Sequence, residues 1–497
     1  MADWKEPVRK LLTGLLRLVK EPSPKDEIIK RLKKETALDK VGIPRWLLGM
    51  IFFVLAVLII FVRKEMSWPL LVGYMMVVFI FVVLIGVYMY RYAPKVMAKK
   101  DNIILIGSIM LLVIGLTKVE TLTNNISPYL VPVAMAGMLI TILLETKLAL
   151  VVAMVLSILS ALINNNGFNY FFVYLLGSLA GIFSVIRVRH RINLASAGLI
   201  ISGINVIAIF SLQLMEGNTF VSIKYDLLWG ILNGFVCSIL SIGLLPYLEN
   251  LFKITTDIRL LELADFNQPL LKKLMLETPG TYHHSLMVGN LAEAAASIVG
   301  ANPILARVGA YYHDIGKLTK PEYFSENYPT VMSKHDDLTP QMSTLILIAH
   351  VKHGVELARE YSLSEDIINL IEQHHGTSLA YYFYQKALEE YEIADIEQQQ
   401  YRYPGPHPQS REAAIIMLAD GVEAASRTLD EPNYLRLQEL VRKIINNKFI
   451  DGQLDECELT LKDLHLIGEK FVYILTSMFH ARVEYPEEKN SRESKEQ

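Results

Sequence analysis

The sequence is short of cysteine and of net charge. Only Cys237 and Cys457 occur among 497 residues, and Cys237 lies in an apolar run. A disulfide framework is therefore not expected, and a reducing, cytoplasmic setting is natural for the C-terminal part. The formal net charge is −3, and the chain has no stripe of Lys and Arg of the kind that follows phosphates. We therefore expect no nucleic-acid polymer as a partner.

Charged residues are scarce between residues 46 and 247, where long apolar runs dominate. Hydrophobic residues make up 52% of the sequence, more than in an ordinary soluble protein. A membrane-spanning helix needs about 17–25 mostly apolar residues. No small-residue cleavage site follows the first run, so we expect that run to be retained. About eight transmembrane helices are predicted, at residues 46–62, 69–90, 103–117, 129–144, 148–163, 170–186, 194–214 and 227–247.

Basic residues are unevenly distributed among the loops between these runs. Residues 1–45, 91–102 and 187–193 are rich in Lys and Arg, whereas the alternate loops are poor in them. Basic loops stay on the cytoplasmic side. Both termini and the part after the last run are therefore predicted to be cytoplasmic, which requires an even number of spans. The sequence thus predicts a multi-pass protein of the cell membrane, with the lipid bilayer as a partner.

Ionisable residues are nearly absent from the runs themselves. Glu145, in a tight turn with Lys147, is the acid nearest to a span interior. A substrate or ion pathway would be marked by charged residues within the spans. A packing or sensing scaffold is therefore the first interpretation of this region, and a transport pathway is the second.

The segments that flank the membrane region differ in character. Residues 1–45 are a basic N-terminal segment, in which Pro7–Lys20 has the spacing of an amphipathic helix, either on a membrane surface or packed on the protein. Residues 248–280 predict a helical connector. It is either one stiff helix with a homodimer seam or an amphipathic connector that only packs. The charged residues 486–497 predict a disordered tail.

Residues 281–485 have the composition of a soluble, all-helical domain. Helix starts are indicated by Asn302-Pro303, by Thr339-Pro340 and by Ser364, because these residue types favour the cap and first position of a helix. The fold class predicted for the chain is therefore all-α: a polytopic helical membrane domain followed by a cytoplasmic helical domain.

Histidine is almost confined to this last part, since only His190 of the twelve precedes His283. At the centre of the group stands His313-Asp314, an imidazole beside a carboxylate, which suits a transition metal. A second pair, His335-Asp336, is expected to lie outside the site. Single histidines such as His353, His407, His465 and His480 are more often surface or core residues. The further candidate donors are His284, His350, His374, His375 and Asp420.

Six or more donors from separate helices and loops indicate a site for two metal ions. Asp314 is the natural bridge, because it sits at the centre of the set. His374 and His375 would lie about 100° apart on a helix, so both can bind only from a helix end, which Gly376 supplies. Lys317, three residues after Asp314, is expected near the same rim, where it can pair with a phosphate and act with Asp314 in catalysis.

Taken together, His284, His313-Asp314 and Asp420 resemble the signature of the HD phosphohydrolase superfamily. Longer stretches resemble the seven-transmembrane receptor HD class, which includes bacterial membrane-bound cyclic di-AMP phosphodiesterases. The likeness covers about residues 69–485. The stretches are LELADFNQPL at 261–270, PGTYHHS at 279–285, GAYYHDIGK at 309–317 and DGQLDEC at 451–457.

The resemblance implies a two-metal centre, commonly of manganese or iron, that hydrolyses a cyclic dinucleotide. A hydroxide between the ions would attack one phosphodiester of cyclic di-AMP and give linear pApA. His284 is preferred to His283, because the family ligand immediately precedes Ser. One ion would be held by His284, His313, Asp314 and Asp420, and the other by Asp314, His350, His374 and His375.

Two features depart from the family pattern. The class usually has a large extracellular domain after its first span, whereas only about Lys64–Trp68 stands there in this chain, so we expect no sensing through such a domain. Related cyclic di-GMP phosphodiesterases continue their His-His-Gly motif with Gly-Tyr-Pro. Here Thr377–Ala380 follows, which argues against that substrate. The alternatives are an HD phosphohydrolase acting on another nucleotide, a non-catalytic nucleotide-binding membrane receptor, and a transporter with a regulatory HD domain.

Overall fold

The computed structural model describes residues 44–62, 68–123, 126–164, 167–327, 334–391, 397–430 and 432–479. The predicted N-terminal amphipathic helix, the predicted tail and His480 lie outside these residues. Within them the protein is all-α, which confirms the predicted fold class, and strand-like pairing is limited to the isolated bridge between Leu379 and Arg402. The chain divides into two compact units, one up to Ile258 and one from Arg259 onward.

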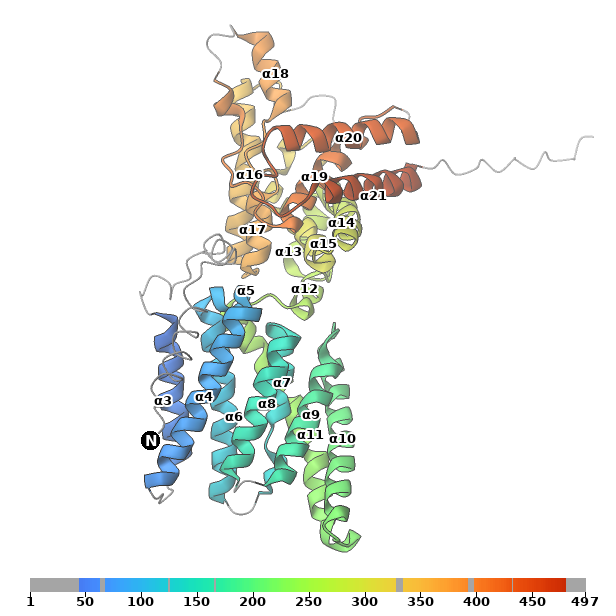
Figure 1. The fold of residues 1–497 in the computed structure, drawn as a ribbon. Helices are drawn as coiled ribbons and strands as arrows, with labels where there is room; N and C mark the ends of the chain where they lie inside the picture. The colour runs from blue at the N-terminus through green and yellow to red at the C-terminus, as the bar shows by residue number, and fades with distance from the viewer. Residues whose placement is uncertain are drawn as a thin grey trace, which may run out of the picture. The chain divides into compact units, whose positions relative to one another are not determined.

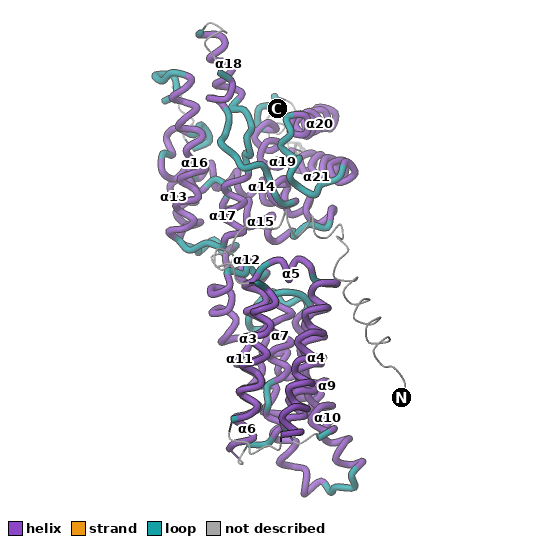
Figure 2. Tube along the Cα trace, turned by 60° about the vertical axis from the view of Figure 1, so that its left-hand side comes forward, coloured by secondary structure: helices purple, strands orange, loops and turns teal. Residues whose placement is uncertain are grey.

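The first unit is a bundle of helices that run side by side (Figure 1, Figure 2). Among its described residues, six helices are long and apolar enough to cross a membrane, and α3 and the α7 region are shorter apolar helices. Large apolar side chains such as Leu58, Phe79 and Ile239 are more than half exposed. Extended apolar surface of this kind suits lipid. The chain is therefore a multi-pass membrane protein. Its helices are α3 (Arg45–Phe61), α4 (Trp68–Tyr92), α5 (Pro94–Ala98), α6 (Lys100–Thr123), η1 (Pro128–Leu130), α7 (Val133–Leu143), α8 (Thr146–Ile163), α9 (Phe168–Val185), α10 (Asn193–Met215) and α11 (Phe220–Phe252).

Two of these helices extend beyond the apolar runs that predicted them. Helix α6 continues through Lys118, which was expected in a loop, and through Glu120, so Glu145 is not the only acid near a span interior. Helix α11 ends at Phe252, because Lys253 takes up the left-handed conformation (φ 51°) that closes a helix. The chain then forms two shorter helices, so the interpretation of the connector as one stiff helix is wrong.

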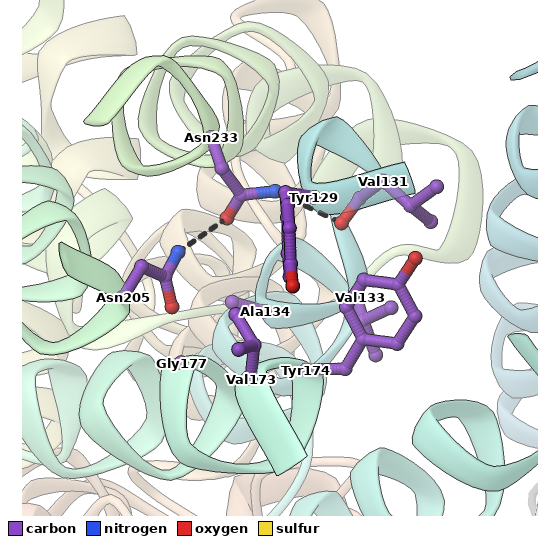
Figure 3. Close-up of a pocket in the computed structure, with 9 residues that line it drawn as sticks. All are labelled: Tyr129, Val131, Val133, Ala134, Val173, Tyr174, Gly177, Asn205 and Asn233. Atoms are coloured by element: carbon purple, nitrogen blue, oxygen red, sulfur yellow. Dashed lines mark hydrogen bonds between the residues drawn. The ribbon is translucent and has the colours of Figure 1, made fainter. Parts of the chain in front are cut away.

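The chain unwinds briefly before α7, where η1 precedes it. The Asn233 side chain on α11 donates to the carbonyl of Val131 (2.9 Å) and accepts from Asn205 Nδ2 on α10 (3.0 Å), as Figure 3 shows. The hydroxyl of Tyr174 on α9 donates to the carbonyl of Pro128 (2.7 Å). Non-helical backbone at membrane depth needs partners within the protein. These side chains therefore fasten α9 and α11 to the unwound segment, and α10 to α11.

The second unit is built round α14, which packs against α15, α19 and α21. The predicted caps Asn302 and Thr339 accept first-turn N–H groups, whereas Ser364 precedes α17 without a side-chain hydrogen bond. Leu260 and Leu274, from the expected connector, are buried in this core. Its helices are α12 (Asp257–Leu263), α13 (Pro269–Glu277), α14 (Pro279–Val299), α15 (Pro303–Tyr312), η2 (Ile315–Thr319), η3 (Pro321–Tyr323), α16 (Pro340–Glu360), α17 (Glu365–Gln373), α18 (Tyr381–Glu390), η5 (Gln398–Tyr401), α19 (Arg411–Ser426), α20 (Tyr434–Ile450) and α21 (Leu461–Phe479).

Candidate metal centre

The structure brings all seven predicted donor side chains together in the second unit. They come from α14, α16 and α19, from the turn between α15 and η2, and from the end of α17. They form two groups, and in each group the candidate ligand atoms lie within 4.8 Å of one another. One group is Asp314, His350, His374 and His375, and the other is His284, His313 and Asp420.

Asp314 faces both groups through its two carboxylate oxygens. Its Oδ1 lies 3.3 Å from His350 Nε2 and 3.8 Å from His374 Nε2. Its Oδ2 lies 3.3 Å from His313 Nε2 and 3.7 Å from His284 Nε2. The carboxylate is 2% exposed. One buried carboxylate placed between two sets of imidazoles is the arrangement that a bridging ligand requires.

Three of the imidazoles are oriented by their own helices. In His313, His350 and His374, Nδ1 lies 2.5–2.7 Å from the backbone carbonyl three residues earlier. An N–H at Nδ1 that donates to this carbonyl leaves the lone pair of Nε2 free to bind a metal. Nε2 of His313 is buried and has no hydrogen-bond partner. A buried polar atom of this kind needs a partner, and a metal ion would supply it.

His284 is oriented by a carboxylate that the sequence reasoning did not single out. Its Nδ1 lies 2.5 Å from Glu423 Oε2, and its Nε2 lies 3.1 Å from Asp420 Oδ1. Glu423 is 3% exposed, and its other oxygen accepts from Arg427 (2.7 Å). Glu423 follows Asp420 by three residues on α19, so both lie on one helix face. The three-residue spacing between Asp420 and Glu423 was the signal in the sequence that could have identified Glu423.

Two glycines permit this local geometry. A Cβ on Gly316 would lie 1.8 Å from the carbonyl oxygen of His350, so η2 can lie directly against α16 only if this residue is glycine. Gly376 has φ of +54°, a conformation that side chains disfavour. It follows the end of α17, where His374 and His375 leave the helix and reach the same cluster.

At His350, His374 and Asp314 the electrostatic environment favours the protonation states that bind metals, whereas at His284 burial is outweighed by hydrogen bonds to Asp420 and Glu423, which raise the pKa to about 10. Burial lowers the pKa of His350, and burial together with the neighbouring His313 lowers the pKa of His374 to about 3. Burial alone would raise the pKa of Asp314, but Lys317 and His313 hold it well below its usual range. Neutral imidazoles and an ionised carboxylate are the forms in which these side chains act as ligands.

Lys317 lies at the cluster, as its spacing from Asp314 predicted. Its Nζ is 2.7 Å from Asp314 Oδ2 and 2.7 Å from Glu326 Oε1. An ammonium has three donors, so one remains for a further acceptor. Lys317 is therefore held in place by two carboxylates and retains a donor that a phosphate could use.

Other histidines in the described part of the chain lie outside both groups. His335 Nε2 donates to the backbone carbonyl of Tyr323 (2.8 Å), and its neighbour Asp336 belongs to neither group. His283 is exposed and lies 3.5 Å from Arg427, so His284 is the member of that pair in the cluster. Five imidazoles and two carboxylates remain together, a donor set that suits manganese, iron or zinc.

Comparison with known proteins gives matches over most of the chain. A family model described as "7TM receptor with intracellular HD hydrolase" matches residues 68–256, and the HD domain model matches residues 281–425. Cyclic-di-AMP phosphodiesterase PgpH of Bacillus subtilis is 40% identical, over 84% of this chain and 60% of its own length. The protein of the same name from Listeria monocytogenes is 38% identical, over 78% of this chain and 54% of its own. The chain thus spans between half and two thirds of the length of these relatives.

Solved structures of the HD domain of L. monocytogenes PgpH also match. One is 45% identical and covers 43% of this chain and 100% of its own, with a TM-score of 0.41. The other, in complex with cyclic-di-AMP, is 45% identical and covers 44% of this chain and 100% of its own, with a TM-score of 0.42.

Proposed function

Since the chain belongs to the family of seven-transmembrane receptors with an intracellular HD hydrolase domain, we propose that it is a membrane-anchored, metal-dependent phosphodiesterase that hydrolyses cyclic di-AMP to pApA. The observation that carries the proposal is the position of Asp314, whose two oxygens face two groups of candidate metal ligands. The 40% identity to a cyclic-di-AMP phosphodiesterase supports the choice of substrate.

The proposed metal assignment follows the two groups and the shared carboxylate. Manganese or iron is the expected metal. When bound, a pair of such ions activates water and neutralises charge on a phosphoryl oxygen. His284, His313, Asp314 and Asp420 would hold one ion, and Asp314, His350, His374 and His375 would hold the other.

The remaining residues of the site position ligands and substrate. The backbone carbonyls beneath His313, His350 and His374 fix the imidazole orientations, and Glu423 does the same for His284. Lys317, anchored on Asp314, would donate its remaining N–H to a phosphoryl oxygen of the substrate. In the hydrolysis, water would add to phosphorus as the P–O3′ bond breaks, and a proton from that water would pass to the 3′ oxygen.

The proposed orientation places both termini and the HD domain in the cytoplasm, where a nucleotide messenger would be found. It is supported by the basic residues of loops 91–102 and 187–193. The helices of the first unit then anchor the phosphodiesterase in the bilayer. Sensing through this unit is compatible with the scaffold interpretation of the membrane domain.

The test is turnover by the full chain, purified in detergent and supplied in turn with manganese, iron and zinc. We expect cyclic di-AMP to be converted to pApA, measured by chromatography with mass detection. A panel of other cyclic and linear nucleotides, run in parallel, separates the alternatives. Turnover of another nucleotide alone would indicate a different phosphohydrolase. Nucleotide binding without turnover under any metal would indicate a receptor and overturn the proposal.

A further inference from the structure

Tyr403, between η5 and α19, lies against the candidate metal centre. Its N–H donates to the carbonyl of Ser378 (3.0 Å), and Ala380 N–H donates to the carbonyl of Tyr401 (2.8 Å). These bonds pair the segment 401–403 with the residues that directly follow the His374-His375 turn. The position of the Tyr403 backbone is therefore fixed relative to two of the candidate ligands.

The ring of Tyr403 covers the imidazole of His375. The two ring centroids are 4.2 Å apart with an angle of 34° between the planes, and the ring meets His350 edge-on at 6.1 Å. Tyr403 is 6% exposed. Offset packing of this kind holds an aromatic ring in one orientation, so the hydroxyl of Tyr403 has a defined position at the site.

The hydroxyl of Tyr403 belongs to a ring that lies against two candidate ligands, His375 and His350. This hydroxyl makes no hydrogen bond to any residue that the structure describes, and it is not fully enclosed by the protein. A phenol is protonated at neutral pH, so the hydroxyl of Tyr403 is a free donor on a ring that contacts His375 and His350.

We propose that Tyr403 is a substrate-contacting residue whose hydroxyl donates a hydrogen bond to a nonbridging oxygen of the phosphodiester under attack. The inference rests on the proposed function and deepens it. Negative charge develops on these oxygens as water adds to phosphorus, and a fixed donor aimed at that charge lowers the barrier. Lys317 then contributes one donor and Tyr403 contributes a second, each held in place by the protein rather than by the substrate.

A purely structural role for Tyr403 predicts different behaviour. If the ring only supports His375, Tyr403→Phe keeps the ring and changes nothing. If the hydroxyl contacts the phosphate, the same substitution lowers kcat and leaves metal binding intact. Tyr401→Phe is the matched control, because Tyr401 lies two residues away, is fully buried and packs instead against Tyr384 (ring centroids 5.6 Å apart).

The experiment compares the wild-type chain, Tyr403→Phe and Tyr401→Phe, each full length and loaded with manganese. Two substrates are used: cyclic di-AMP and bis(p-nitrophenyl) phosphate, a diester without a nucleoside. A hydrogen bond to a charged group corresponds to a change in rate of about 10- to 100-fold. We expect Tyr403→Phe to lose about this much kcat on both substrates, with unchanged metal content, while Tyr401→Phe retains wild-type kcat.

Three results would overturn the inference while leaving the proposed function standing. One is an unchanged kcat in Tyr403→Phe. Another is a loss of metal from that variant, which would make Tyr403 a support for the ligands. The third is a defect with cyclic di-AMP only, which would place the contact on the nucleoside. A wild-type chain that hydrolyses neither substrate would remove the proposed function and this inference together.

Discussion

The two units bury polar side chains in different ways. In the membrane unit the polar contacts between helices include neutral pairs, such as Thr117 with Ser160 (3.1 Å) and Asn205 with Asn233 (3.0 Å). In the second unit, ionisable side chains converge on a single point around Asp314. Neutral pairs of this kind fasten one helix to the next, although Oδ1 of Asn205 is itself buried without a partner. The side chains that surround Asp314 do not form neutral pairs of this kind.

This difference indicates different roles for the buried polar side chains of the two units. Nε2 of His313 is buried without a partner, although its imidazole is surrounded by other potential ligands. Burying a polar atom without a partner costs about 1–3 kcal/mol, and a fold that served stability alone would place apolar side chains there. Among the described residues, groups of three or more candidate ligands occur only in the second unit. The comparison therefore indicates packing for the neutral pairs, and it supports the proposal that the second set binds metal.

The largest effect is expected from removing the centre of the cluster. His313→Ala combined with Asp314→Ala deletes the shared carboxylate and a neighbouring imidazole. Residues that merely orient metal ligands account for about 10- to 100-fold in activity, so we expect this variant to lose more than 100-fold in turnover of cyclic di-AMP. The matched control is His335→Ala with Asp336→Ala, the same change at a pair outside both groups. Equal losses in both variants would contradict the account.

A smaller loss is expected from the carboxylate behind His284. Glu423→Gln keeps the size of the side chain but removes the negative charge at His284 Nδ1. We expect about 10- to 100-fold weaker metal binding or activity, measured by titrating apoprotein with manganese while following turnover. Glu412→Gln, on the same helix but bonded to the backbone of Asn302, is the control. If both variants bind manganese like the wild type, Glu423 has no part in orienting His284.

A still smaller effect is expected from the neutral pair in the membrane unit. Asn233→Ala removes the bonds to Asn205 and to the carbonyl of Val131. Polar contacts between membrane helices are worth about 0.6 kcal/mol on average and up to about 2. We therefore expect a slightly lower thermal midpoint in detergent and an unchanged kcat. A collapse of activity with full metal content would show that the asparagines do more than pack.

The smallest effect is expected from a partly exposed ion pair of the second unit. Arg402 contacts Asp451 at 2.9 Å, with about a fifth and a third of the two side chains exposed. Burial opposes the effect, but hydrogen bonds from Arg402 and Gln453 lower the pKa of Asp451 below its usual 3.8.

A lowered pKa means that the charged form stabilises the fold above that usual value, and that this contribution is lost as the pH falls through the lowered pKa. Asp451→Asn should therefore reduce stability at pH 7 by under about 1 kcal/mol. The difference from the wild type should shrink below about pH 4 in thermal unfolding. A difference that grows on acidification would contradict the assignment.

Much of the fold followed from the sequence, because apolar runs and helix caps are local signals. Asn302 and Thr339 cap the helices they were expected to begin. The end of α11 was not predictable, since it depends on a left-handed Lys253, a residue type with no preference for that conformation. The buried stretch of α6 around Glu120 was not predicted to be helical either, because its charged residues suggested a loop.

The candidate ligands followed from residue type, but their supporting residues did not. His313 and Asp314 stand out because an imidazole and a carboxylate are adjacent. Glu423 shows only its three-residue spacing from Asp420 and Tyr403 shows no mark, and their roles depend on where α19 and the 401–403 segment lie in three dimensions. Contacts between residues far apart in the chain cannot be derived from spacing alone. The metal roles of the seven donors likewise stay predictions.

Elemental analysis of the freshly purified full chain tests the central claim most directly. Two groups of ligands that share Asp314 predict about two transition-metal ions per chain, removable by chelation together with activity and absent from the His313→Ala/Asp314→Ala variant. A chain that retains no transition metal after purification and takes up none when manganese, iron or zinc is supplied would contradict the account.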